Sequence, residues 1–131
     1  MIVAVHALTG AALSRLCRTR LQAFSLGFLS HLPCDMAPHR DLGLLEEGVL
    51  LGAALSLVAA MPGARSKEFA GAVGAASADV ENVIGRALGI PDERLLLPTH
   101  SRCHGREIRS VRGQVALSLC ALAVICWPRR H

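Results

Sequence analysis

The chain has 131 residues, a length that suits one domain, and 52% of its residues are hydrophobic while 18% are charged, against about 25% charged residues in ordinary soluble domains. Aromatic residues make up 3% and tyrosine is absent, so the apolar mass is mainly leucine, alanine and valine, which is typical of helices packed in lipid or closely against each other. The net charge of +4 comes from arginines in short runs beside apolar segments, and because no aromatic residues interleave with these runs we expect no nucleic-acid partner.

Two apolar segments at the start of the chain, residues 2–17 and 21–32, predict two helices joined by a basic turn. The first contains His6, whose imidazole needs a polar partner in an apolar setting. A signal peptide is the alternative for this segment, but its arginines follow the apolar run instead of preceding it. Pro33 has no backbone N–H, so we expect it to kink or end the second helix.

Residues 42–61 are the best candidate for a membrane-spanning helix. Twenty helical residues rise about 30 Å, which matches the hydrocarbon layer of a bilayer. Glu46 and Glu47 fall in the first two turns, where they suit a helix N-terminus and can reach the headgroups. Pro62 and Gly63 then end the segment.

The basic residues that follow this segment predict its orientation. Arg65 and Lys67 lie just beyond its end, and arginines tend to remain on the cytoplasmic side of a membrane. If the basic turn at residues 15–20 is cytoplasmic too, the second and third segments form a hairpin whose turn, residues 33–41, lies at the outer face.

The rest of the chain predicts shorter helices. Residues 69–78 are rich in glycine and alanine, residues 79–89 continue as an amphipathic helix, residues 91–112 form a basic loop, and residues 114–127 form a last apolar helix. We therefore predict an all-α, single helical membrane domain over residues 1–131, with four to five helices, two to four of them embedded in the lipid membrane.

The polar string between the second and third segments indicates a metal site. His31 and Asp35 are four residues apart, so on a helix they share one face, and neutral imidazole and carboxylate both suit zinc. His39 follows one turn later, beyond a proline. Asp41 is either a further ligand or the N-cap of the next helix. The alternative for all of these residues is that they only satisfy the polar groups of helix ends.

A second set of polar residues occurs farther along the chain. Asp79 and Glu81 lie at the start of the amphipathic segment, where they either take part in a site or face solvent as a helix start. His100 stands in the basic loop and is either a ligand or a solvated surface residue.

Several stretches resemble a known family. The segment from Gly27 to His31 with Asp35-Met36 is similar to the G-x-L-S-H-x3-D-M segment of the inner-membrane-bound, metal-dependent hydrolases. The segments His6 to Gly10, Ala78 to Asn82 and Thr99 to Ser101 look like three further motifs of that family, although their order along the chain differs. The resemblance implies an integral protein of a bacterial-type inner (cell) membrane and the hydrolase class.

These observations predict a membrane-bound, metal-dependent hydrolase acting on an ester or phosphoester near the membrane surface. A divalent ion, with zinc as the first expectation, would lower the pKa of a bound water, and Asp79 or Glu81 would serve as the base or as a further ligand. The alternative is a non-enzymatic, structural or interaction protein of the membrane. The expected metal ligands are His6, His31, Asp35, His39 and His100.

Overall fold

The computed structural model describes residues 1–91, 94 and 105–128, and the described residues form six α-helices and no strand. The all-α prediction is therefore confirmed. The expected count of four to five helices was low, because the segment after residue 69 breaks at a turn in which Asp79 N donates to Ala76 O at 3.1 Å. The helices are α1 (Val3–Leu13), α2 (Arg20–Met36), α3 (Leu44–Val58), α4 (Lys67–Ser77), α5 (Val80–Ala87) and α6 (Arg112–Cys126), with a 3₁₀ turn at Ser14–Leu16 and a π-helical turn at Ala59–Gly63.

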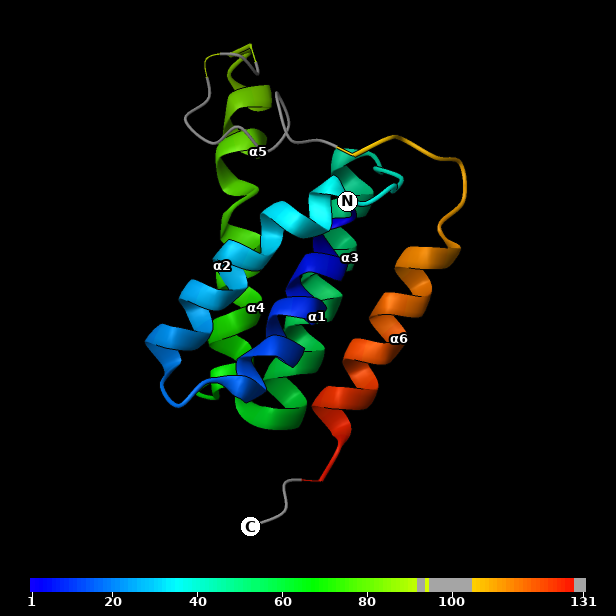
Figure 1. Ribbon diagram of the computed structural model, residues 1–131. Helices are drawn as coiled ribbons and strands as arrows, with labels where there is room; N and C mark the ends of the chain where they lie inside the picture. The colour runs from blue at the N-terminus through cyan, green and yellow to red at the C-terminus, as the bar shows by residue number, and fades with distance from the viewer. Residues whose placement is uncertain (92–93, 95–104, 129–131) are drawn as a thin grey trace.

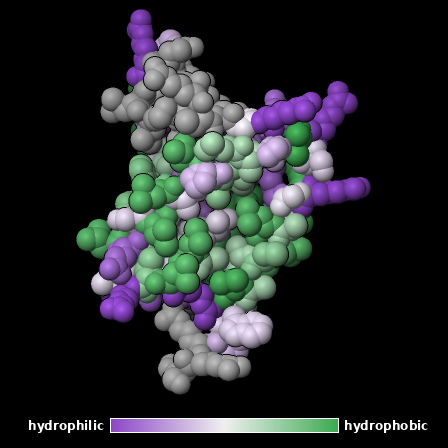
Figure 2. Space-filling view, viewed as in Figure 1, coloured by the Kyte–Doolittle hydropathy of each residue, from purple (hydrophilic) through white to green (hydrophobic). Residues whose placement is uncertain are grey.

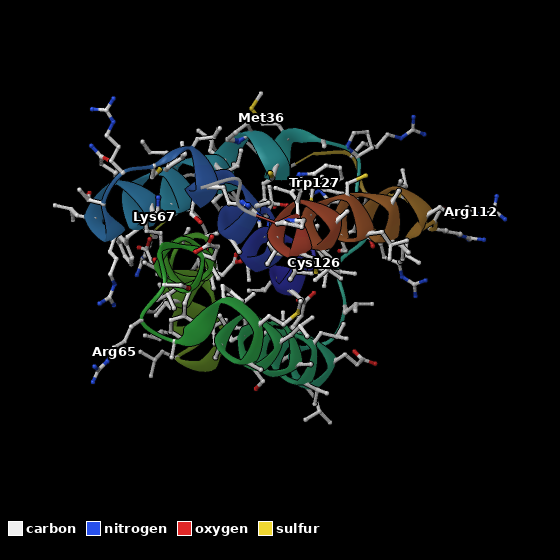
Figure 3. The ribbon with its side chains drawn as sticks, turned by 90° about the horizontal axis from the view of Figure 1, so that it is seen from below. Met36, Arg65, Lys67, Arg112, Cys126 and Trp127 are labelled. Carbon is white, nitrogen blue, oxygen red and sulfur yellow. The ribbon has the colours of Figure 1, made fainter. Side chains whose placement is uncertain are left out.

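Helices α1 to α4 run alternately down and up, and α1 is the central one (Figure 1). Seen along the bundle in Figure 3, α1 is surrounded by α2, α4, α3 and α6, and it contacts all four. Most of α1 is buried, including Ala7 and Ala11, which have no exposed surface. A central helix must be apolar on every side, which explains the run of small and aliphatic residues around His6.

Glycines allow α1, α2 and α4 to approach one another closely. A Cβ atom at Gly71 of α4 would collide with the carbonyl oxygen of Gly10 on α1, and a Cβ at Gly27 of α2 would collide with the carbonyl oxygen of Gly71. At Gly74 the obstacle would be the carbonyl oxygen of Phe24. Small residues at helix crossings bring backbones into contact, as in the helix pairs of membrane proteins.

Helix α2 presents the most polar buried face of the bundle. Thr19 caps its N-terminus by accepting from Gln22 N at 3.1 Å, while the Gln22 side chain accepts from Thr19 N at 3.2 Å. The helix continues three residues beyond Pro33, which lies inside it. His31 and Asp35 therefore share the last turns of one helix, as their spacing predicted, and both are buried.

The loop after α2 is held by the chain segment before α6. Gly105 N donates to Asp35 O at 2.7 Å, and His39 pairs with this segment through Ile108 N and Arg106 O at 2.8 and 3.2 Å. Helix α3 then begins at Leu44, where the Glu46 side chain accepts from Gly43 N at 2.6 Å. Asp41 is not the N-cap of this helix, so the capping alternative for Asp41 was wrong.

One helix in the described part of the chain is long and apolar enough to cross a membrane. It is Leu44–Gly63, with 20 residues. The most apolar 18 residues of this helix have a mean hydropathy of 1.8, and 11% of them are buried. Val3–Leu16 and Arg112–Cys126 are apolar but shorter than a span requires. Two to four membrane-embedded helices were expected, and one meets the criterion of length and hydropathy.

The surface of the molecule carries large apolar side chains at its middle and basic side chains toward its ends. On the face in Figure 2, apolar residues fill a central region and hydrophilic residues gather toward the edges. Exposed side chains include Leu45 at 81%, Val49 at 64% and Leu119 at 62%. At the lower end Arg15 caps α6 by donating to the carbonyl oxygens of Ile125 and Trp127 at 3.0 and 2.8 Å.

Candidate metal centre

Four buried polar side chains meet near the upper end of the bundle. His6 comes from the second turn of α1, His31 and Asp35 from the end of α2, and Asp79 from the turn between α4 and α5. Their exposed fractions are 1%, 1%, 0% and 6%. Buried histidines and carboxylates are costly unless they are paired or bind a cation, so this group defines the candidate site.

Asp35 connects the two histidines. Its Oδ1 lies 3.0 Å from His6 Nε2, and its Oδ2 lies 3.4 Å from His31 Nε2. Asp79 also lies beside His31, with its Oδ1 3.4 Å from His31 Nε2. The two imidazole rings are stacked, with centroids 3.9 Å apart and an angle of 22° between their planes.

A backbone carbonyl group sets the orientation of the His31 imidazole. His31 Nδ1 lies 3.2 Å from the carbonyl oxygen of Ala75 on α4, to which Nδ1–H donates. This bond directs His31 Nε2 toward Asp35 and Asp79. Histidines that bind metals are commonly oriented in this way. The role of Ala75 left no signal in the sequence, because any residue type has the same carbonyl group.

Burial and the Asp35 carboxylate change the protonation of both histidines. Burial lowers the pKa of His6, and the hydrogen bond to Asp35 offsets this effect only in part. Burial also acts to lower the pKa of His31, but the hydrogen bond to Asp35 and the charge of Asp79 outweigh it, so that pKa is raised. Burial acts to raise the pKa of Asp35, but hydrogen bonds from His31 and His6 prevail and lower it. Asp35 is therefore an anion that holds two imidazoles.

His6, His31 and Asp79 have the composition and spacing of a metal site. One potential ligand atom from each lies within 4.8 Å of the other two. Tetrahedral zinc ligands lie about 3.3 Å apart, given zinc–nitrogen bonds of about 2.0–2.1 Å. A modest inward movement of the side chains would therefore complete three bonds. Two imidazoles and one carboxylate with a fourth position open is a donor set of catalytic zinc sites.

A small pocket of about 60 Å³ leads from the surface to Asp79. It gives a small molecule or water access to an otherwise buried group. Its polar walls include Asn82, which is buried at 5% exposure beside Asp79, and Asp41, which is 31% exposed. The full lining comprises Met1, Val3, Asp41, Leu42, Leu44, Glu47, Asp79, Asn82 and Val83.

The other predicted site residues have different positions. His39 is fully buried, but its Nδ1–H donates to Ala37 O at 2.7 Å and its Nε2 lies 3.2 Å from Asp41 Oδ1. His39 thus belongs to a neighbouring pair. The Met1 amino group joins that pair to the site, at 3.0 Å from Asp41 Oδ1 and 2.7 Å from Asp35 Oδ1.

Two further predictions concern the downstream half of the chain. Glu81 is half-buried in the first turn of α5, and it is not among the residues that line the described pocket. Asp79 is thus the member of this acidic pair that reaches the histidines. His100 lies outside the described residues, so its role as a ligand stays a prediction.

Comparison with protein-family models, curated protein sequences and solved structures finds no match for this chain. The resemblance to membrane-bound hydrolases therefore remains a prediction from short motifs, and the geometry of the site carries the functional argument.

Proposed function

We propose that the protein is a membrane-bound, metal-dependent hydrolase whose ion is held by His6, His31 and Asp79. The observation that carries this proposal is the convergence of these three buried side chains, from three parts of the chain, within 4.8 Å of one another. A structural role alone would not require a pocket that reaches one of them. Zinc is the divalent ion that best suits two imidazoles and a carboxylate.

Each residue of the site has a distinct part in this chemistry. A bound ion would supply a water of lowered pKa and polarise the oxygen of a scissile ester or phosphoester. Asp35 orients the His6 imidazole through Nε2 and keeps a negative charge beside His31. Asp41, on the pocket wall, would accept the proton of a water in the pocket, and the Asn82 amide would donate to the substrate oxygen that gains negative charge.

The proposal places α3 across a membrane, with the site near one surface. Its length, hydropathy and low burial support this placement. The basic residues Arg15 and Lys67 lie together at the opposite end of the bundle from the site, where Lys67 donates to the carbonyl oxygen of Cys17. Arg40 and Arg109 lie at the end that holds the site, so basic residues flank both ends of the proposed span. A bacterial-type inner membrane is the location that the motif resemblance implies.

Elemental analysis of protein purified in detergent tests the proposal. We expect about one zinc ion per chain in the wild type and strong depletion in His31→Ala, with His39→Ala as the matched control that keeps its metal. A wild-type protein without any divalent metal, after growth and purification with added zinc, would refute the proposal.

The alternative function is that of a structural or interaction protein of the membrane. It is favoured by the internal pairing of the site, since Asp35 already accepts from the Met1 amino group and lies beside two imidazoles. In that case added zinc would leave the unfolding temperature unchanged, whereas a specific metal site raises it by mass action.

A further inference from the structure

An apolar groove continues outward from the polar pocket. The groove lies between α3 and α5 and has a volume of about 250 Å³. It shares five wall residues with the pocket at Asp79. The groove and the pocket are therefore adjacent, with these residues between them. The shared residues are Val3, Leu44, Glu47, Asp79 and Val83.

The surface of this groove is apolar, although two acidic residues mark its inner end. Its outer rim is open, with Val80, Val83 and Ile84 of α5 exposed at 51%, 41% and 52%. The facing wall is α3, the helix that we propose crosses the membrane. The groove thus opens sideways, toward the surface that would face lipid.

A second apolar groove, of about 350 Å³, lies on the other side of α3 and provides a contrast. It runs between α3 and α6 and includes Leu50, Leu57 and Leu119 among its walls. None of its walls belongs to the polar pocket. An apolar depression on this bundle therefore need not reach the site, and the groove beside α5 is distinguished by its connection to it.

We infer that the substrate is a membrane lipid, with its ester group at the metal and one hydrocarbon chain in the groove between α3 and α5. This inference rests on the proposed function and specifies its substrate. The ester is polar and suits the pocket at Asp79, and the chain is apolar and suits the groove. Because the groove opens toward the bilayer, the lipid enters from the side and does not leave the membrane.

Two glycines of α3 allow a matched test. A Cβ atom at Gly48 or at Gly52 would have no atom within 4 Å beyond its own stretch of helix backbone, so both positions accept a larger side chain. Gly48 lines the groove, whereas Gly52, one turn farther along the same helix, does not. Gly48→Phe therefore fills the groove, and Gly52→Phe adds the same side chain outside it.

The probes are alkyl hydroxamic acids, which chelate zinc through the hydroxamate and carry a chain of chosen length. Binding of acetohydroxamic and octanohydroxamic acid to zinc-loaded protein in detergent would be measured by calorimetry. Each methylene buried strengthens binding about fourfold, so we expect octanohydroxamic acid to bind at least about 100-fold more tightly once several methylenes are buried. Gly48→Phe should lose most of this advantage and keep its affinity for acetohydroxamic acid, while Gly52→Phe should match the wild type.

Nanodiscs containing phosphatidylcholine with brominated acyl chains test whether the hydrocarbon chain in the groove comes from the membrane. Ile84→Trp, made in a Trp127→Phe background, places one fluorophore on the groove wall, and we expect brominated chains to quench it. An unquenched Trp at position 84 would mean that the groove opens to water and would overturn a membrane lipid as substrate.

The outcomes separate the two proposals. If neither hydroxamic acid binds because the protein holds no metal, the proposed function fails. If both bind and Gly48→Phe retains the full preference for the longer chain, the metal centre stands and the inference about the lipid chain is wrong.

Discussion

Two halves of the bundle are packed in different ways. Helices α1, α2 and α4 meet through glycine contacts, and the buried side chains of His6, His31 and Asp35 come from α1 and α2. Helices α3, α5 and α6 are joined less closely, with open grooves between them and many exposed aliphatic side chains. The tight half holds polar groups in fixed positions, whereas the open half exposes the apolar surface on which the proposed contact with lipid depends. The predictions below test this difference.

The largest effect is expected for Gly71→Val. The new side chain meets the Gly10 carbonyl and Ser14 Cβ, which cannot yield unless α1 and α4 separate. We expect a loss of more than about 4 kcal/mol, enough to prevent folding. Circular dichroism during heating in detergent measures it. Gly48→Val, in open space on α3, is the control and should fold; a Gly71→Val protein that melts like the wild type would contradict close packing of α1 and α4.

The next effect is expected for Asp35→Ala in metal-free protein. Removing the carboxylate leaves two buried imidazoles without their shared anion, at a cost of about 3–5 kcal/mol. Chemical denaturation with a chelator present measures the free energy of unfolding. Asp41→Ala removes a carboxylate that is 31% exposed and should cost less. Equal losses in the two variants would show that burial of Asp35 does not matter.

Zinc affinity should separate Asp79 from Glu81. Asp79 lies beside His31, so Asp79→Asn should weaken zinc binding by about 100-fold or more, beyond the 10–100-fold typical of groups that only orient ligands. Glu81→Gln changes the same charge two residues away and should have little effect. Competition titration with a chromophoric chelator gives both constants. The reverse order would assign the ligand to α5 instead of the turn before it.

Acid should destabilise the metal-free protein through Asp35. Its pKa is lowered on folding, so its contribution is complete above the unfolded pKa of about 3.9 and is lost as the pH falls below that value. The pKa of His6 is lowered on folding, so its contribution to the free energy of unfolding also decreases as the pH falls. The pKa of His31 is raised on folding, so its contribution is present below about pH 6.5 and is lost as the pH rises.

Near neutral pH the contributions of the two histidines to the free energy of unfolding therefore change in opposite directions. Below about pH 4 the contribution of Asp35 accounts for most of the pH dependence. Between pH 5 and pH 3 the wild type should lose up to about 1.4 kcal/mol per pH unit more than Asp35→Asn. Thermal unfolding across this range measures the difference. Parallel curves for the two proteins would exclude Asp35 as the source.

The smallest effect is expected for Gly52→Ala. The added methyl group enters open space on an exposed helix face, so the free energy of unfolding should change by less than about 1 kcal/mol, in the stabilising direction. Thermal unfolding measures this change and compares it with that of Gly27→Ala, which should be destabilised because a methyl group at Gly27 meets the Gly71 carbonyl. Similar losses in both would mean that the two halves are equally tight.

The sequence predicted the helices and half of the site. Periodicity and apolar runs located the segments that became α1, α2, α3 and α6, and the spacing of four predicted that His31 and Asp35 share one face of a helix. The sequence did not predict which of the two carboxylates, Asp35 or Asp79, would be the metal ligand. Sequence reasoning made Asp35 a ligand and left Asp79 among several roles, because a carboxylate that binds a metal and one that orients a histidine are the same residue type.

The sequence by itself predicted an all-helical chain whose best membrane-spanning candidate is residues 42–61, because hydropathy and periodicity are properties of neighbouring residues. Only the tertiary structure decided that His6, His31 and Asp79 meet, since successive members of this group are 25 and 48 positions apart in the sequence. The physical reason is the glycine contact between α1, α2 and α4, which brings three backbones close enough for short side chains to converge. The same structure decided which apolar groove reaches the site, because that depends on how α5 lies against α3.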